Sequence, residues 1–159
     1  MSYNIKRANL EDCPKVLKLI KSSFTSKNLG NFELTLESLQ KNGFGKDQIF
    51  YLHVVAKYPE DILIGYSISS IRCTTWRGRE VYVEDLYIAS SQVANDLKKK
   101  LLKAVCSFAK NMNSNSLTLA CPVKDLNGYS FYLKLNADDI TITENCHYLC
   151  FKSIKSLCN

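Results

Sequence analysis

The sequence predicts an α/β fold of the α+β kind, with helices on both faces of a mixed, mostly antiparallel central sheet. Three observations lead to this prediction. Between Phe50 and Ile88 the chain is rich in β-branched and aromatic residues, and turn clusters divide this stretch into three strands. From Val93 the apolar residues follow a helical spacing. Strand and helix patterns then alternate to the end of the sequence, as they do in layered domains.

The first elements are a strand and two helices. Alternating residues predict a strand over Tyr3–Arg7. Asn9 or Asp12 can cap the helix that follows, whose apolar stripe comprises Cys13, Val16, Leu17, Ile20 and Phe24. A second, short helix is predicted over Thr35–Leu39, and the pair Asn42-Gly43 is expected to stop it because both residue types favour helix ends.

A hairpin and a third antiparallel strand form the middle of the sheet. The segments Phe50–Lys57 and Ile62–Arg72 are separated by a turn cluster that contains Pro59. A second turn leads into the strand Glu80–Ile88. The long helix that begins near Val93 has an apolar stripe of Leu97, Leu101, Val105, Phe108 and Met112.

The rest of the chain predicts three short strands and one helix. The strand Ser116–Cys121 precedes the helix Leu126–Lys134, and strands around Ile140–Glu144 and His147–Ile154 close the sequence. With 159 residues, 46% of them hydrophobic, the chain can fill one core. We therefore predict a single domain over residues 1–159, with no linker.

The net charge of +6 favours acidic partners only in a general way. It comes from Lys98–Lys100 and from scattered lysines, a pattern that favours a solvated face over nucleic-acid binding. No apolar run is long enough to span a membrane, and the N-terminal residues lack an apolar signal segment. The sequence predicts an intracellular protein, cytoplasmic or nuclear, without a membrane association.

The seven cysteines are odd in number and irregularly spaced, which favours reduced thiols over a disulfide framework. Cys146, His147 and Cys150 could begin a zinc site. A structural zinc site needs four ligands with paired spacing, however, and the other histidine, His53, sits in an apolar run. We therefore predict no metal.

Several motifs match one known family. They are Asp12-Cys13, Asn42-Gly43-Phe44-Gly45, Ile64-Gly65-Tyr66, Trp76, Tyr82-Val83-Glu84-Asp85-Leu86-Tyr87 and Ser130-Phe131-Tyr132. With the order of elements, these motifs make the chain similar to the GNAT superfamily, and to its spermidine/spermine (diamine) and thialysine acetyltransferases in particular. The similarity extends over essentially the whole chain and implies the GNAT fold.

The resemblance also implies an active site for transfer of an acetyl group from acetyl-CoA to an amine. It implies that Glu84 is the general base, that Asp85 completes an acidic pair facing the amine, and that Tyr132 protonates the leaving thiolate. It assigns Trp76 and Glu144 to the amine-binding side. Without the resemblance, the two carboxylates could simply be polar residues at a strand end and the tyrosine a core aromatic residue.

The resemblance places the cofactor along the strand Glu80–Ile88 and at the start of the next helix. Backbone amides at Leu86 and Ile88 would bind the acetyl carbonyl and the pantetheine arm. The family's phosphate loop carries three glycines, which let the backbone approach the pyrophosphate at a helix N-terminus. In this chain that loop reads Val93, Ala94, Asn95, Asp96, Leu97 and Lys98.

This loop departs from the family pattern, because each of its special residues is replaced. Side chains at Ala94, Asp96 and Lys98 would crowd the phosphates, and the Asp96 carboxylate would repel them. A loop asparagine of the family is also replaced here, by Asp125. The lysines that follow Asp96 could supply positive charge instead.

These departures lead to two alternative functions. The first hypothesis is a non-catalytic GNAT-fold protein that uses no cofactor and works through a protein partner or as a dimer. The alternative is an active acetyl-CoA-dependent N-acetyltransferase acting on a small diamine, a thialysine-like amino acid or a protein lysine. The resemblance further implies a homodimer.

Overall fold

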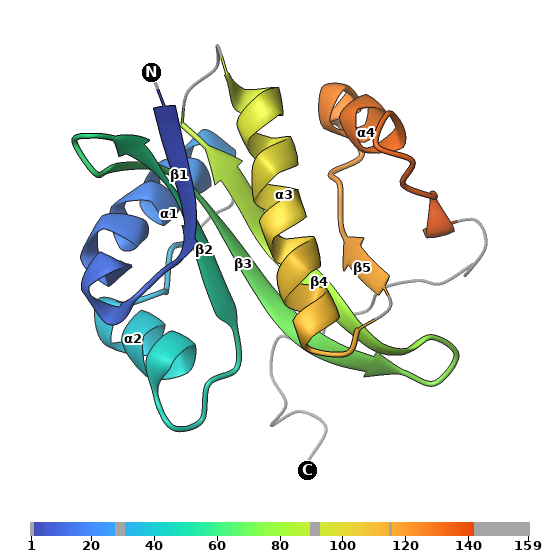
Figure 1. Ribbon diagram of the computed structural model, residues 1–159, viewed down its shortest axis with the longest axis horizontal. Coiled ribbons are helices and arrows are strands. Elements are labelled where there is room, and N and C mark those ends of the chain that lie inside the picture. Colours follow the sequence, from blue (N-terminus) through green and yellow to red (C-terminus); the bar gives the residue numbers. More distant parts are fainter. Residues whose placement is uncertain (1, 28–30, 90–92, 115, 142–159) are drawn as a thin grey trace. The chain divides into compact units, whose positions relative to one another are not determined.

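The computed structural model describes residues 2–27, 31–89, 93–114 and 116–141 (Figure 1). By internal contacts the chain divides into two compact units, Met1–Ala120 and Cys121–Asn159. The single domain over residues 1–159 stays a prediction. The first unit contains β1 (Ser2–Arg7), η1 (Leu10–Asp12), α1 (Cys13–Lys27), α2 (Leu36–Phe44), β2 (Tyr51–Tyr58), β3 (Ile62–Thr74), β4 (Gly78–Ile88), α3 (Ala94–Asn111) and β5 (Ser116–Leu119).

Five strands form one sheet in the order β1-β2-β3-β4-β5. The first four pair with antiparallel neighbours, whereas β4 and β5 run parallel. A parallel pair needs a long crossover connection, and α3 lies within it. The predicted mixed, mostly antiparallel sheet is confirmed.

The cap predicted at Asn9 or Asp12 forms, and Thr35, predicted as part of the second helix, is the cap of that helix. Asn9 and Asp12 make a reciprocal capping box at η1, with both N···O distances at 3.0 Å. Thr35 caps α2 by accepting a hydrogen bond from the Ser38 amide.

The predicted end of α2 is wrong, because the helix continues through the pair Asn42-Gly43 to Phe44. Gly43 is buried, and a Cβ atom there would lie 2.7 Å from the ring of Phe50. Glycine at this position therefore serves close packing and does not stop the helix. The helix ends at Gly45, whose amide donates to the Lys41 carbonyl at 2.9 Å.

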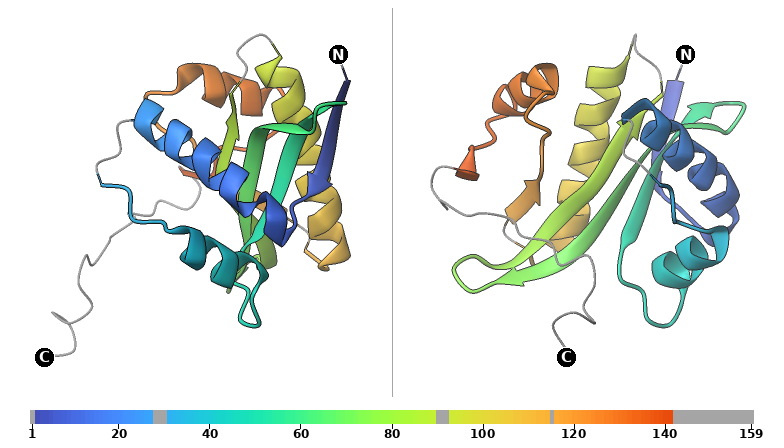
Figure 2. Two further views of the ribbon diagram at one scale, coloured as in Figure 1. Left: turned by 90° about the vertical axis from the view of Figure 1, so that its left-hand side faces the viewer. Right: turned by 180° about the vertical axis from the view of Figure 1, so that it is seen from behind.

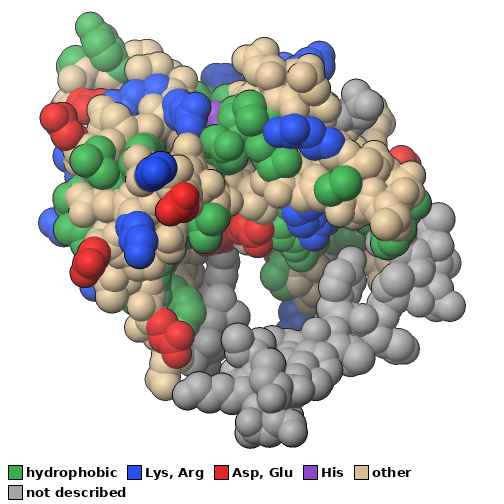
Figure 3. All heavy atoms as spheres, turned by 90° about the horizontal axis from the view of Figure 1, so that it is seen from below, with side chains coloured by type: hydrophobic (Ala, Val, Ile, Leu, Met, Phe, Trp, Pro, Cys, Tyr) green, Lys and Arg blue, Asp and Glu red, His purple; other side chains and the backbone are tan. Residues whose placement is uncertain are grey.

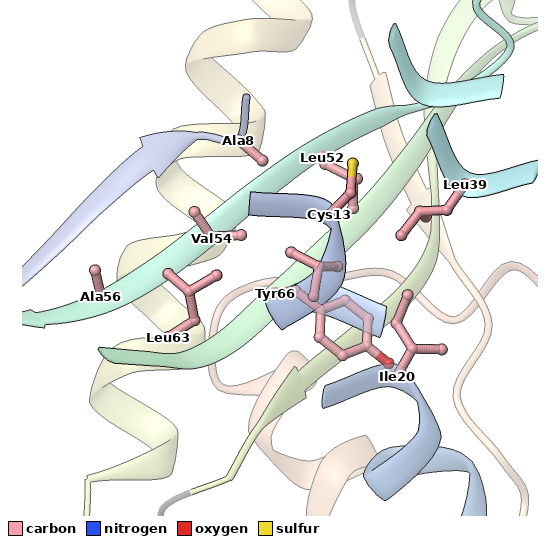
Figure 4. Packing of buried hydrophobic residues seen from close by; sticks show 10 residues of the cluster. Ala8, Cys13, Ile20, Leu39, Leu52, Val54, Ala56, Leu63 and Tyr66 are labelled. Carbon is pink, nitrogen blue, oxygen red and sulfur yellow. The ribbon is translucent and has the colours of Figure 1, made fainter. Parts of the chain in front are cut away.

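Helices cover both faces of the sheet, as predicted (Figures 1 and 2). Val54 and Val55 are both buried and belong to different clusters, since successive strand residues point to opposite faces. On one face α1 and α2 pack on β2 and β3, through Cys13, Val16, Ile20, Leu39, Leu52, Val54 and Tyr66 (Figure 4). On the other face α3 packs on β2 and β4, through Leu97, Leu101, Val105, Val55, Val81, Val83 and Ile88.

The second unit contains the predicted helix, α4 (Leu126–Leu133). The strand predicted around Ile140–Glu144 is wrong at its first two residues, Ile140 and Thr141, where the backbone is helical. The rest of that prediction and the strand His147–Ile154 lie outside the described residues. Cys13, Cys73 and Cys106 are free thiols. None of the helices within the described ranges is long and apolar enough to cross a membrane.

A buried carboxylate joins three strands near the tip of the β3–β4 hairpin. Glu80 has no exposed surface, and its oxygens accept from Arg72 at 2.6 Å, from Thr118 at 2.8 Å and from Arg77 at 3.3 Å. The Arg72 guanidinium also lies 3.8 Å from the ring centroid of Tyr82. Burial opposes ionisation, but the hydrogen bonds from Thr118 and Arg72 and the two arginine charges hold the pKa of Glu80 below its usual value.

Replacing Glu80 by glutamine is expected to lower the free energy of unfolding by about 2–3 kcal/mol at pH 7. The loss is below that of a fully buried pair because both arginine side chains are partly exposed to solvent. Urea unfolding followed by circular dichroism measures it, with the exposed Glu37→Gln as the control. Since the folded pKa is lowered, the stabilisation is present above the unfolded pKa near 4.5 and is lost as the pH falls through the folded value. An equal stability difference at pH 7 and pH 3 would contradict this explanation.

Candidate active site

A β-bulge in β4 shapes the candidate site. Ile68 on β3 lies opposite Asp85, and the next residue, Ser69, lies opposite Val83. Glu84 is therefore the extra residue of the bulge, without an opposite residue on β3. Bulges bend a strand and redirect side chains, and they are common beside active sites.

The bulge places the two acidic side chains on the same face of the sheet. Glu84 accepts a hydrogen bond from the Ser70 hydroxyl at 2.6 Å, and Asp85 accepts one from the Tyr66 hydroxyl. Ser70 and Tyr66 are four residues apart on β3 and so share a face. Tyr66 is buried against α1, so this is the face that α1 and α2 cover. In a regular strand, two consecutive carboxylates would point in opposite directions.

Asp85 is held in place from two sides. Its second oxygen accepts from the Leu86 amide at 2.9 Å. Burial, followed by the hydrogen bond to Asp85, raises the pKa of Tyr66 well above its usual value, so this hydroxyl remains a donor at physiological pH. Ser23 on α1 also bonds to the Tyr66 hydroxyl. Asp85 is thus a fixed negative charge.

Glu84 is in a different environment, although it is the next residue. Its side chain is exposed, and its bonded partner is the Ser70 hydroxyl. An exposed carboxylate with lone pairs left over can accept a proton from a ligand or from water. Of the two acidic residues, Glu84 is therefore the one placed to act as a base.

β4 continues beyond the residues that pair with β5. β5 pairs with β4 only from Glu80 to Val83, so the last residues of β4 have no strand partner on that side within the described ranges. Leu86 and Ile88, the predicted cofactor-binding positions, lie in this part of β4. Their side chains pack toward α3. The Leu86 amide donates to Asp85, so it could bind an acetyl carbonyl only after that hydrogen bond is released.

The N-terminal turn of α3, where the family binds pyrophosphate, is poorly suited to a phosphate group. Val93 occupies the N-cap position and makes no side-chain cap hydrogen bond. Asp96 lies in the first turn, where its carboxylate occupies the positive end of the helix dipole and pairs with Lys100 at 2.8 Å. Leu97 is fully buried, and Ala94 packs on the same cluster.

The structure shows which of the loop side chains expected to crowd the phosphates point toward the core and which do not. The methyl group of Ala94 faces the core, so it is not the side chain that obstructs a ligand at the helix end. Asn95 is exposed and Lys98 is half-buried. Asp96 is therefore the residue that most opposes an anion, because it adds negative charge where the family binds pyrophosphate.

Two residues predicted on the amine side are not brought to Glu84. Trp76 lies in the turn between β3 and β4 and is 65% exposed. β4 begins at Gly78, six residues before Glu84, which corresponds to about 20 Å along an extended strand. Trp76 is therefore distant from Glu84 along the strand, and its role toward the amine stays a prediction. Glu144 lies outside the described residues.

The predicted acid, Tyr132, belongs to α4 of the second unit. It is half-buried, and its ring centroid lies 5.3 Å from that of Phe131. Asp125, predicted near the cofactor, caps α4 by accepting from the Gly128 amide at 2.9 Å. The roles of both residues toward acetyl-CoA stay predictions.

Sequence reasoning missed the residues that hold the acidic pair, Tyr66 and Ser70. The motif Ile64-Gly65-Tyr66 was recognised, but the partner of its tyrosine was not. Counting residues back from the hairpin turn could have paired the strands, yet the bulge shifts the register by one residue beyond Val83. The sequence contains no separate signal for that shift.

Known acetyltransferases resemble the chain in sequence over most of its length. No protein-family model matches the chain. Mouse thialysine N-epsilon-acetyltransferase is 26% identical over 150 residues, which cover 90% of this chain and 88% of that protein. Human spermidine/spermine N(1)-acetyltransferase-like protein 1 is 24% identical over 94% of this chain, which spans 22% of that longer protein.

Solved structures match the fold. An aminoglycoside acetyltransferase from a soil metagenome, solved with sisomicin, has a TM-score of 0.74 and 21% identity, covering 94% of this chain and 97% of its own. Glucosamine-6-phosphate N-acetyltransferase from Arabidopsis thaliana has a TM-score of 0.69 and 16% identity, covering 96% and 99%. The chain therefore has the fold of the GNAT acetyltransferases, and along nearly its whole length it resembles the thialysine and spermidine/spermine acetyltransferases.

Proposed function

We propose that the chain is an acetyl-CoA-dependent N-acetyltransferase that acetylates a small amine, with Glu84 as the general base. The observation that carries this proposal is the bulge in β4, which presents an exposed Glu84 beside a fixed Asp85 on one face of the sheet. Both carboxylates of the family motif are present: buried Tyr66 holds Asp85, and half-buried Ser70 holds Glu84.

The two carboxylates suit a cationic substrate. At neutral pH an alkylamine is protonated and cannot attack a thioester, so one proton must be removed first. Asp85 provides a fixed charge that attracts the ammonium group, and Glu84 accepts its proton directly or through water. Acetyl-CoA, when bound, supplies the activated acetyl group.

The names of the relatives indicate the kind of amine. Thialysine, spermidine and spermine, which appear in those names, are flexible molecules with primary amino groups. We expect a substrate of this class, because Asp85 can attract one primary ammonium group and Glu84 can remove its proton. The tyrosine of α4, Tyr132, is the proposed acid for the leaving thiolate.

Acetyl-CoA fits the two ends of this site unequally. The part of β4 beyond its pairing with β5 suits the pantetheine arm, since backbone groups there lack a strand partner on that side among the residues described. The Asp96–Lys100 pair at the start of α3 does not suit the pyrophosphate. The proposed enzyme therefore binds its cofactor weakly through the phosphates, and Lys98 and Lys99 provide positive charge nearby, since Lys100 is paired with Asp96.

A second candidate is a non-catalytic protein that acts through a protein partner or as a homodimer. The glycine-free start of α3, with its carboxylate at the positive end of the helix, favours this candidate. Nothing on the amine side of the site favours it, because Glu84 and Asp85 are both in place.

Acetyl-CoA titration distinguishes the two candidates. Isothermal calorimetry of the purified chain with acetyl-CoA is expected to show binding in the range from tens of micromolar to millimolar, about a thousandfold weaker than a site with an intact glycine loop. Release of the coenzyme A thiol in the presence of thialysine or spermidine is then expected. Absence of both binding and thiol release, up to millimolar ligand, would leave the non-catalytic candidate.

A further inference from the structure

A cavity of about 350 Å³ opens on the α3 face of the sheet, away from the acidic pair. It lies where α3 crosses β1 and β2, and Ile5, Arg7, His53, Ser107, Phe108 and Asn111 are among the residues that line it. In Figure 3 a small purple area, the colour of histidine, is visible between basic and hydrophobic side chains. The proposed acetyl transfer does not use any of these residues.

Two basic side chains face each other in this cavity. Arg7 on β1 and His53 on β2 are directly opposite in the antiparallel register. The Arg7 guanidinium lies over two aromatic rings, 5.1 Å from the centroid of Tyr51 and 5.9 Å from that of Phe108. These rings fix the guanidinium by packing and leave its hydrogen-bond donors for another group.

Arg7 is exposed, and it lacks the carboxylate partner that the two partly buried arginines of the β3–β4 hairpin have. Arg72 and Arg77 both bind the buried Glu80. Within the described ranges Arg7 forms no ion pair, and the lining of the cavity contains neither aspartate nor glutamate. Lys6 also contributes to the lining, but its ammonium group is directed to Asp12 and Asp61 at 3.7 and 3.9 Å. Arg7 is thus a positioned cation without an anion.

His53 adds a second polar group to the cavity. It is only 5% exposed, and its Nδ1 atom is buried without a hydrogen-bond partner. Burial lowers the pKa of His53, and the charge of Arg7 lowers it further, so the imidazole is neutral at pH 7. A buried N–H without an acceptor is rarer than a buried acceptor without a donor. We therefore assign the proton to Nε2, on the edge that remains to line the cavity.

We propose that this cavity binds a small anionic molecule bearing a carboxylate or phosphate group, which accepts hydrogen bonds from the Arg7 guanidinium and from His53 Nε2. A guanidinium fork matches the two oxygens of either group. The volume suits a small organic molecule, whose apolar part would contact Ile5 and Phe108.

The test is nuclear magnetic resonance of the whole chain, labelled on its histidine rings. Sodium phosphate and sodium acetate are the probes, added at constant ionic strength with chloride as the balancing ion. The His53 ring signals are expected to shift in a saturable manner with either probe at constant pH, and a titration with sodium chloride alone is the control. No saturable shift up to about 50 mM of either anion would overturn the proposal, because one bidentate arginine contact should be detectable in this range.

Variants identify the residues that bind the anion. Arg7→Gln is expected to weaken binding by at least about tenfold, whereas Lys41→Gln, which removes the same charge on the opposite face, leaves it unchanged. Ser107→Glu keeps Arg7 and its packing on the rings but introduces a carboxylate into the lining, so it is expected to abolish binding while the chain stays folded. Equal binding by Arg7→Gln and Lys41→Gln, or full binding by Ser107→Glu, would overturn the assignment.

Discussion

Replacing Glu84 by glutamine is expected to lower kcat for acetylation of a small amine by about 10²–10⁴-fold. Glutamine has nearly the shape of glutamate and can still accept the Ser70 hydrogen bond, but it cannot take a proton from the ammonium group. Release of the coenzyme A thiol measures turnover, and calorimetry measures acetyl-CoA affinity, which is expected to stay the same. The loss should therefore affect the chemical step and not cofactor binding.

Two variants sharpen this prediction. Glu33→Gln removes an exposed carboxylate of the same type, outside the helices and strands, and serves as the matched control. Tyr66→Phe removes the hydroxyl that holds Asp85 and leaves Glu84 in place, so it should raise KM for the amine more than it lowers kcat. If Glu84→Gln turned over as fast as Glu33→Gln, the base would have to be another residue, and the proposed mechanism would be wrong.

The sheet and most helices could be predicted because their signals are local. β-Branched and aromatic residues between turn clusters defined the strands around Val54 and Val83, and the apolar stripe of α3 was visible in Leu97, Leu101 and Val105. The capping residues Asn9 and Thr35 also act on backbone groups within three positions. Elements of this kind depend little on what the rest of the chain does.

The parts that could not be predicted depend on contacts between distant segments. Gly43 lies inside a helix and leaves room for the ring of Phe50, which packs against it. Nothing in residues 35–45 contains that information. The bulge at Glu84 and the Tyr66–Asp85 hydrogen bond arise from the register of two strands. A sequence alone gives the approximate positions of the strands, but a one-residue shift reverses which side chains share a face.

The candidate site shows the same limit. The positions of Glu84 and Asp85 were identified by resemblance to a motif, and the structure supplies what the motif does not contain, namely which of the two is fixed and which is exposed. The motif also does not contain the distance from Trp76 to the pair, since β4 alone extends about 20 Å from the hairpin turn to Glu84. The role of Trp76 stays a prediction. Residues that belong to motifs of the same family need not lie close together in the folded sheet.

Restoring glycine at Ala94, Asp96 and Lys98 together is expected to tighten acetyl-CoA binding by on the order of a thousandfold. The change removes the carboxylate from the first turn of α3 and releases Lys100 from its 2.8 Å ion pair. It also lets the backbone amides approach a pyrophosphate, which two or three charge-assisted hydrogen bonds would then hold. Calorimetry with acetyl-CoA, and with coenzyme A as a second ligand, measures the gain.

The stability of α3 limits how far this variant can be interpreted, because each glycine in a helix costs about 1 kcal/mol relative to alanine. The single change Asp96→Asn avoids this cost and is expected to give about a tenfold gain from charge alone. Asp47→Asn, at an exposed position outside the helices and strands, is its control. If Asp96→Asn bound acetyl-CoA no more tightly than Asp47→Asn, Asp96 would not be the obstacle. If the unaltered chain already bound in the low micromolar range, side chains such as Lys98 would be holding the phosphates, and the missing glycines would not have weakened the site.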